Sequence, residues 1–164
     1  MSERENILEL KNVVYSFHTY GGEVKAVRDV SYEVRQGEIL GIVGESGCGK
    51  SVTAQCILRL NPEPPGFFEG GEILYKGQDV LKMSKKEIRK IRGREIGFVF
   101  QDPMTSLNPT MRVGAQIEEV FLGRTDVSKK EVKERAMDIM RLVGISDVEK
   151  RYKQYPHELS GGMK

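Results

Sequence analysis

Apolar and polar residues alternate in two stretches near the start of the chain. Residues 7–17 and 24–35 both show the two-residue period of a strand that buries one face. Between them, residues 19–23 (Thr-Tyr-Gly-Gly-Glu) have the composition of a hairpin loop. We therefore predict an antiparallel strand pair here.

Three later runs are also strand-sized. Residues 38–43 are apolar and bounded by glycines, which is typical of a strand buried on both faces of a parallel sheet. Residues 72–76 and 95–100 predict two more strands. Residues 51–60 predict a helix, after which the prolines and glycines of residues 61–71 predict a loop.

Helical signals follow. Ser84 and Glu87 have capping-box spacing and predict a helix that begins there and ends near Arg92. Residues 113–122 predict a second helix, and Ser128 with Glu131 repeats the capping-box spacing. The helix that follows Ser128 places five apolar side chains on one stripe and ends at Gly144. The stripe consists of Val132, Ala136, Ile139, Met140 and Val143.

These patterns predict two domains. Residues 1–101 are rich in strands, and residues 102–164 are helical. The composition is that of a water-soluble globular chain with a formal net charge of +2. No apolar run approaches the roughly 18 residues that cross a membrane, and the polar start shows no secretory signal.

Charge and cysteine content narrow the class. A net charge near zero argues against a general nucleic-acid binder, so we expect no nucleic acid among the partners. Cys48 and Cys56 form neither a CxxC pair nor a disulfide framework, which favours a reducing, cytosolic setting. A cluster of Lys and Arg around residues 82–94 could meet an anionic lipid or nucleic acid, but interleaved glutamates favour a solvated helix face.

The strongest chemical signal is a phosphate-binding loop. Its residues match the pattern G-x-x-x-x-G-K-[ST] and lie after a predicted buried strand and before a predicted helix. They are Gly44, Glu45, Ser46, Gly47, Cys48, Gly49, Lys50 and Ser51.

Each fixed position of this loop has a physical purpose. Glycines let successive amides point at one anion, and the helix that follows adds its unpaired amides and positive dipole end. Lys50 would contact the β- and γ-phosphates, and the Ser51 hydroxyl would ligate Mg²⁺. The alternative is a glycine-rich turn that matches by chance. For Cys48, an incidental side chain is favoured over a redox role.

Two further elements follow in a fixed order. Gln101 ends a predicted strand within Phe-Gln-Asp-Pro-Met-Thr-Ser-Leu-Asn-Pro, and Leu159-Ser160-Gly161-Gly162-Met163 follows later in the sequence. With the phosphate loop, they resemble the Walker A loop, Q-loop and LSGGQ-type signature of ABC transporter ATP-binding subunits. The sequences around Gln101 and residues 155–163 are similar to the dipeptide and oligopeptide (and nickel) importer branch.

The resemblance implies a fold and roles for these residues. The fold is α/β, a P-loop NTPase of ABC type with an N-terminal antiparallel β part, a partial parallel core and a helical subdomain. Gln101 would contact Mg²⁺ or the attacking water. Residues 159–163 would close over ATP held by a second subunit, with Ser160 at a helix start; an ordinary N-cap is the alternative.

The resemblance also implies an aromatic side chain stacked on adenine. Phe17 fits best and Tyr20 is the alternative, although a packed strand aromatic competes with this role for Phe17. Val52 stands where many relatives have a threonine, so only its backbone amide would contact the α-phosphate. Thr53 lies one position too late to replace it.

One family element is missing from these residues. No apolar strand followed by Asp-Glu occurs, so the general base and a parallel neighbour of residues 38–43 are absent. We expect an N-terminal fragment, incomplete in its Walker B and switch-histidine half, that binds nucleotide weakly and does not hydrolyse ATP alone.

For the parent protein, the resemblance implies an ATPase at the cytoplasmic face of the membrane. Its cofactors would be ATP and Mg²⁺, and its partners membrane permease subunits and a second ATPase subunit, identical or related, arranged head to tail. The alternatives are a soluble ABC ATPase acting on DNA or in translation, and a non-catalytic regulatory fragment.

Overall fold

The structure is a computed structural model that describes residues 5–101, 106–122 and 128–163. It divides the chain into two compact units, residues 1–96 and 97–164, which are described separately below. The domain boundary predicted after residue 101 stays a prediction. No helix in the described residues is long and apolar enough to span a membrane.

The predicted hairpin is confirmed in the first unit. Strand β1 (Asn6–Thr19) pairs antiparallel with β2 (Gly22–Arg35), and the last pair of the ladder joins Thr19 to Gly22. Only Tyr20 and Gly21 remain in the turn. The alternating pattern and the short Gly-containing connection together specify this pairing.

The sheet has four strands in the order β2-β1-β3-β4, with β3 spanning Gly66–Tyr75 and β4 Gln78–Asp79. The prediction of a loop over residues 61–71 is therefore wrong from Gly66 onward. Glycines carry no side-chain pattern that marks a strand, but their amides and carbonyls can pair with β1. A local sequence pattern cannot predict this pairing, because the paired residues lie far apart in the chain, as Phe17 and Gly66 do.

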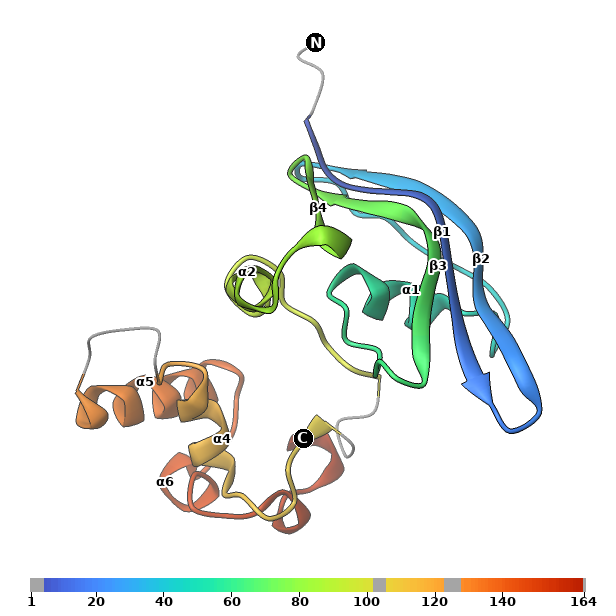
Figure 1. Ribbon diagram of the computed structural model, residues 1–164. Coiled ribbons are helices and arrows are strands. Elements are labelled where there is room, and N and C mark those ends of the chain that lie inside the picture. The colour runs from blue at the N-terminus through green and yellow to red at the C-terminus, as the bar shows by residue number, and fades with distance from the viewer. Residues whose placement is uncertain (1–4, 102–105, 123–127, 164) are drawn as a thin grey trace. The chain divides into compact units, whose positions relative to one another are not determined.

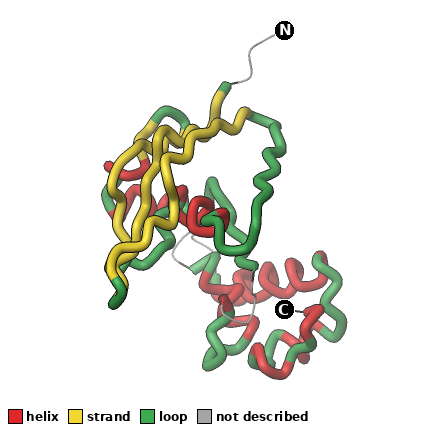
Figure 2. The backbone as a smooth tube through the Cα atoms, turned by 90° about the vertical axis from the view of Figure 1, so that its right-hand side faces the viewer, coloured by secondary structure: helices red, strands yellow, loops and turns green. Residues whose placement is uncertain are grey.

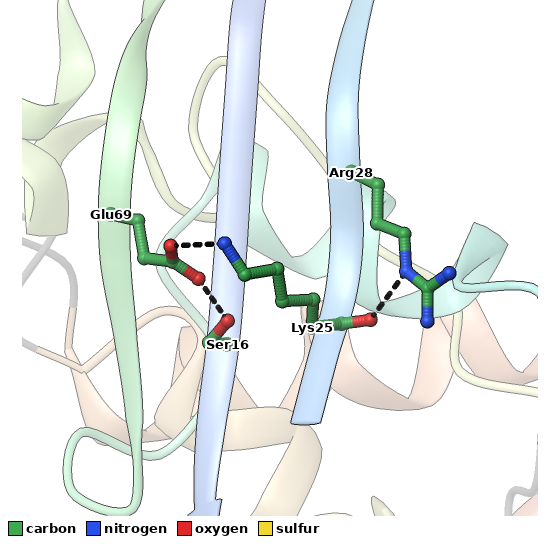
Figure 3. A network of polar contacts seen from close by, with 4 residues as sticks. All are labelled: Ser16, Lys25, Arg28 and Glu69. Carbon is green, nitrogen blue, oxygen red and sulfur yellow. Dashed lines mark hydrogen bonds and ion pairs between the residues drawn. The ribbon is translucent and has the colours of Figure 1, made fainter. Parts of the chain in front are cut away.

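Glu69, in the misassigned segment, joins three strands (Figure 3). Its carboxylate accepts a hydrogen bond from the Ser16 hydroxyl on β1 and forms an ion pair at 2.8 Å with the Lys25 ammonium on β2. The Arg28 Nε donates to the Lys25 carbonyl at 3.2 Å. The Lys25 ammonium, and then the Ser16 hydroxyl, lower the pKa of Glu69. These contacts tie β3 to the hairpin.

Helix α1 (Lys50–Ile57) lies on the concave side of this curved sheet (Figure 1). The same unit contains the 3-10 turn η1 (Val80–Lys82) and helix α2 (Lys85–Ile91). The buried apolar side chains come from the sheet and from the α1 and α2 regions. They include Leu10, Val13, Tyr15, Val27, Cys56, Leu58, Ile73, Tyr75, Val80, Ile88 and Ile91.

The capping box of α2 is confirmed. The Glu87 amide donates to the Ser84 hydroxyl at 3.3 Å, and the Ser84 amide donates to the Glu87 carboxylate at 2.8 Å. The two bonds satisfy amides that the first helical turn leaves unpaired.

The strands predicted at residues 38–43 and 95–100 are wrong for this structure. Residues 38–43 form no strand, and the side chains of Ile39 and Val43 are 99% and 96% exposed. Residues 97–100 also form none, and a single parallel bridge joins Arg92 to Ile96. A strand needs a hydrogen-bonded neighbour, and no described strand pairs with either segment. The predicted parallel core is therefore not formed in the described residues.

The second unit is helical (Figure 2). Its helices are α4 (Val113–Glu119), α5 (Lys129–Leu142) and α6 (Val148–Arg151), followed by the 3-10 turns η2 (Pro156–Glu158) and η3 (Gly161–Met163). The loop between α5 and α6 is short, and α4 packs against α5.

The predicted stripe of α5 is confirmed in part. Val132, Ala136 and Met140 are buried, whereas Ile139 and Val143 are 41% and 68% exposed. The stripe is therefore narrower than the sequence predicts. At the start of α5 the Ser128 hydroxyl accepts a hydrogen bond from the Glu131 amide.

Of the two hydrogen bonds of the second capping box, the described contacts include only the one from the Glu131 amide to the Ser128 hydroxyl. The Glu131 carboxylate accepts a hydrogen bond from Arg135 at 2.7 Å, one helical turn later. An ion pair at this spacing competes with the return bond to the amide of Ser128.

Candidate nucleotide-phosphate site

Residues 44–49 form a loop that leads directly into α1. Gly47 and Gly49 have φ angles of 82° and 93°, in the left-handed region that favours glycine. A Cβ at Gly49 would also lie 2.2 Å from the Ala26 carbonyl oxygen on β2. Because only glycine avoids this overlap, the loop can turn sharply while held against the sheet.

The start of α1 leaves amides available. Within the described residues, the amides of Lys50, Ser51 and Val52 make no hydrogen bond to protein acceptors, and Thr53 donates the first helical bond, to the Gly49 carbonyl at 2.8 Å. No side chain caps this end. Unpaired amides and the helix dipole together favour an anion.

The Lys50 ammonium lies over the same loop. It donates to the carbonyls of Gly44 and Glu45 at 2.7 and 2.6 Å and contacts the Cys48 sulfur at 3.4 Å. These contacts hold its positive charge beside the loop. A Cβ at Gly44 would lie 2.8 Å from the Cys48 sulfur, so glycine also leaves room here.

The other predicted loop residues are accessible to a ligand. Glu45, Ser46 and Cys48 are exposed, Ser51 is exposed with its hydroxyl unbonded among the described contacts, and Val52 is half-buried. Residues 44–52 thus form one continuous loop and first helical turn, and their role in binding a nucleotide stays a prediction. A hydroxyl, an ammonium and several amides are the groups that a metal-bound polyphosphate needs.

Phe17 lies on β1, beside the strand β2 that contacts this loop through Ala26. Its register partner Val24 is two residues from Ala26, which contacts Gly49. The Phe17 ring is half-buried and meets the edge of Tyr15 at 5.3 Å between centroids. Tyr20, at the hairpin turn, is fully exposed. The role of either side chain at adenine stays a prediction.

The predicted signature segment has two apolar anchors. Leu159 is 6% exposed and lies in the core of the helical unit with Val113, Met140 and Val148, and Met163 packs against this core. Between these anchors, residues 160–162 are exposed. The anchors therefore present one hydroxyl and two glycine backbones on the surface of their unit.

The Ser160 carbonyl accepts a hydrogen bond from the Met163 amide at 3.0 Å, so residues 161–163 form a single 3-10 turn. Gln101 is exposed in the same unit. The Asp102-Pro103 part of the motif lies outside the described residues. The roles of Gln101 and residues 159–163 stay predictions.

Two contacts of the loop were not predicted from the sequence. The Thr53 hydroxyl donates to the Gly49 carbonyl at 2.9 Å, so this side chain braces the loop from inside the helix. The Ala26 carbonyl contacts Gly49 from a strand more than 20 residues earlier. The first could have been inferred from the four-residue spacing of a helical Thr, but no local pattern reveals the second.

Comparison with known proteins places these observations in a family. The sequence profile of the family described as ABC transporter matches residues 27–164. The oligopeptide transport ATP-binding protein OppD of Bacillus subtilis is 56% identical over 96% of this chain and 44% of its own length. The dipeptide transport ATP-binding protein DppD of the same organism is 49% identical over 98% of this chain and 48% of its own.

Solved structures agree. The dimeric ATP-binding cassette MJ0796, bound to ADP and Pi, superposes with a TM-score of 0.78 at 27% identity, over 95% of this chain and 64% of its own. CbiO1 of Clostridium perfringens gives a TM-score of 0.65 at 25% identity, over 98% and 57%. The chain spans about half the length of the curated relatives it matches. The chain belongs to the ABC transporter family, and its fold is that of an ABC ATPase cassette.

Proposed function

We propose that this chain supplies the ATP-binding part of an ABC ATPase subunit that drives import of peptides across a membrane. The observation that carries the proposal is the loop of residues 44–49 with its left-handed glycines, together with the unpaired amides at the start of α1 and the Lys50 ammonium held against the loop carbonyls. The similarity to OppD and DppD supports peptide import as the process.

Each group of the loop has a defined task in this proposal. The amides of residues 50–52 donate to phosphate oxygens, and the Lys50 ammonium neutralises the terminal phosphates, exchanging its carbonyl contacts for phosphate oxygens. The Ser51 hydroxyl is the group in this loop that fits Mg²⁺, a hard cation that prefers oxygen ligands. Bound there, Mg²⁺ would offset the negative charge that builds up as the γ-phosphate is transferred.

The proposal also includes a second subunit. Two cassettes meet head to tail, and the exposed Ser160, Gly161 and Gly162 of one contact the nucleotide held by the other. Gln101 responds to the metal and the attacking water. The dimeric form of the MJ0796 cassette supports this arrangement. The remaining partner is a membrane permease, which would hold the subunit at the cytoplasmic face.

Calorimetric titration with Mg·ATP tests nucleotide binding. Lys50→Ala is expected to abolish the heat of binding, because the ammonium is the one side-chain cation that contacts this loop among the described residues. Lys86→Ala is the control, since Lys86 is exposed on α2 and makes no contact with the loop. Equal heats in the Lys50→Ala variant and the unmodified chain would refute the proposal.

The transport part needs its own measurement. Co-purification with the membrane permease of a peptide importer, compared with DNA binding at low salt, separates a transport subunit from an ATPase that acts on nucleic acid. Phosphate release by the chain tests the expectation that it does not hydrolyse ATP alone. A Lys50-dependent turnover would show that a general base lies within these residues.

A further inference from the structure

A second basic site lies in the first unit, away from the phosphate loop. A pocket of about 270 Å³ is lined by residues that follow α1 and by residues of α2 and its end. Four of its lining side chains are cations, namely Arg59, Lys85, Arg89 and Arg92, and one is a carboxylate, Glu63. The lining therefore carries an excess of three positive charges.

Two of the guanidinium groups are held by the backbone. Arg92 donates from Nε to the Leu58 carbonyl at 2.8 Å and from Nη2 to the Arg59 carbonyl at 2.5 Å, so it caps the C-terminal end of α1. Arg59 donates from Nη1 to the Met83 carbonyl at 3.0 Å. These bonds restrict both side chains before any ligand arrives, which reduces the entropy lost on binding.

The backbone conformation of Arg59 is a further sign that this side chain is held in position for a ligand. Its φ of 49° lies in the left-handed region, directly after the C-cap of α1, where glycine is the usual residue. A non-glycine residue there is destabilised, and such positions are often functional. The conformation directs the Arg59 side chain toward Met83 and the pocket.

The positive charges of this pocket form no close ion pair with a described carboxylate. Within the described residues, none of the four cations, nor Glu63, forms an ion pair within 4.0 Å, whereas Lys76 and Lys82 nearby both do. Burial, and then the neighbouring Arg59 and Arg89, lower the pKa of Arg92, and Glu63 opposes this shift only in part. Like charges gathered in one pocket repel, so an anion would stabilise the arrangement.

The pocket also offers unused donors. A guanidinium has five N–H groups; Arg92 uses two of them and Arg59 one in the bonds above, and Arg89 uses none among the described contacts. Lys85, Arg89 and Arg92 follow the spacing of one helix face. Planar guanidinium forks bind phosphate oxygens in pairs, and three net charges favour a dianion over a carboxylate.

We propose that this pocket binds a phosphate monoester group, carried by a free phosphate compound or by the headgroup of an anionic lipid. The site is separate from the phosphate loop, and the inference stands whether or not the proposed function is correct. Arg89 is the residue to alter, because it makes no hydrogen bond within the described residues and its loss should not disturb the fold.

The experiment uses the chain with Lys50→Ala throughout, so that the phosphate loop does not contribute. In one arm, inorganic phosphate is titrated and the arginine Nε–H signals are followed by NMR. In the other, the chain is sedimented with vesicles of phosphatidylcholine with or without phosphatidic acid. Arg89→Gln and Lys85→Gln are compared with Lys86→Gln, which removes the same charge from α2 outside the pocket.

We expect Arg89→Gln and Lys85→Gln to weaken binding on the order of tenfold and Lys86→Gln to change it by less than about twofold. Such a difference with inorganic phosphate identifies a free phosphate compound. The same difference with phosphatidic acid vesicles alone identifies a lipid headgroup. Equal effects of all three variants, or no binding in either arm while the thermal unfolding midpoints are unchanged, would overturn the proposal.

Discussion

At the scale of single residues, backbone geometry decides which side chains the phosphate loop tolerates. Gly49 combines a φ of 93° with a contact that a Cβ would make at 2.2 Å from the Ala26 carbonyl. Gly47 has a similar φ of 82° but open space around it. Substituting each glycine by alanine therefore distinguishes two destabilising effects. At Gly47 only the left-handed backbone opposes the substitution, whereas at Gly49 the overlap with Ala26 opposes it as well.

Gly49→Ala should lower the free energy of unfolding by more than about 2 kcal/mol, because the methyl group must displace the strand or the loop. Gly47→Ala should cost only about 1 kcal/mol, which is the conformational penalty alone. Urea unfolding followed by circular dichroism measures both. Similar losses for the two variants would show that Ala26 does not restrain the loop.

Tyr15 provides a second residue-scale test. Its side chain is fully buried, and its hydroxyl has no hydrogen-bond partner among the described residues. The hydroxyl of Tyr75, buried in the same sheet, donates to the Glu95 carboxylate at 3.2 Å. Tyr15→Phe should raise the free energy of unfolding by about 1 kcal/mol near neutral pH, whereas Tyr75→Phe should lower it by about the same amount.

The Tyr15 comparison also has a defined pH dependence. Burial, followed by Glu63 and Cys56, raises the pKa of Tyr15 to about 12 from 10.0. Between these two pKa values the folded chain keeps the proton that the unfolded chain has lost. The free energy of unfolding is therefore unaffected by this group below pH 10 and decreases as the pH rises toward 12. Tyr15→Phe should remove that loss. An unfolding curve that shows the same alkaline decline in both proteins would contradict the assignment.

At the scale of elements, helix packing brings the signature segment into place. The loop after α6 closes on the start of α4, where the amides of Val113 and Gly114 donate to the carbonyls of Gln154 and Tyr152 at 2.8 and 3.0 Å. The Tyr152 hydroxyl donates to the Glu118 carboxylate one turn later on α4. Leu159 follows in the same core. The position of residues 159–163 therefore depends on the packing of Tyr152 against α4.

Gly114 allows the Tyr152 ring to pack against α4, because a Cβ at position 114 would lie 2.3 Å from that ring. Gly114→Ala should destabilise the helical unit by about 2 kcal/mol, although alanine favours helices. In a Tyr152→Ala background, the same change should be stabilising, since the ring is gone and only the helix preference remains. Thermal unfolding of the four proteins in this cycle tests the reversal of sign. Additive effects would refute it.

At the scale of the whole molecule, the core lies where the strands pair and not where the sequence is most apolar. Ile73 on β3 is fully buried, whereas Ile42, in an equally apolar run, is 48% exposed. The run at residues 38–43 forms no ladder in the described residues. Hydrophobicity alone therefore does not identify the core of this chain.

Isoleucine-to-threonine substitutions at positions 73 and 42 test which of the two apolar segments belongs to the core. Ile73→Thr should lower the free energy of unfolding by about 3 kcal/mol, because it leaves a cavity and buries a hydroxyl. Ile42→Thr should change it by less than about 0.5 kcal/mol. Denaturant unfolding of the two variants measures both values, and a large loss for Ile42→Thr would show that residues 38–43 are part of the core.

Much of the fold could be predicted because its signals are local. The β1–β2 hairpin follows from alternation and a short turn, and the α2 capping box from the spacing of Ser84 and Glu87. The glycine spacing of residues 44–49 predicts a tight turn before α1, and the left-handed φ angles of Gly47 and Gly49 agree with it. The start of β3 at Gly66 could not be predicted, because its strand character comes only from pairing with β1.

The sequence by itself determined the hairpin, the starts of α2, α4 and α5 and the family, and it marked residues 44–51 as the candidate phosphate loop, because these depend on residue type at short spacing. Only the tertiary structure decided that Ala26 holds Gly49, that Glu69 joins three strands and that Arg59, Arg89 and Arg92 share a pocket. It also decided that residues 38–43 stay unpaired. Each of these outcomes depends on groups far apart in the chain, whose meeting is governed by strand pairing and packing and by no local preference.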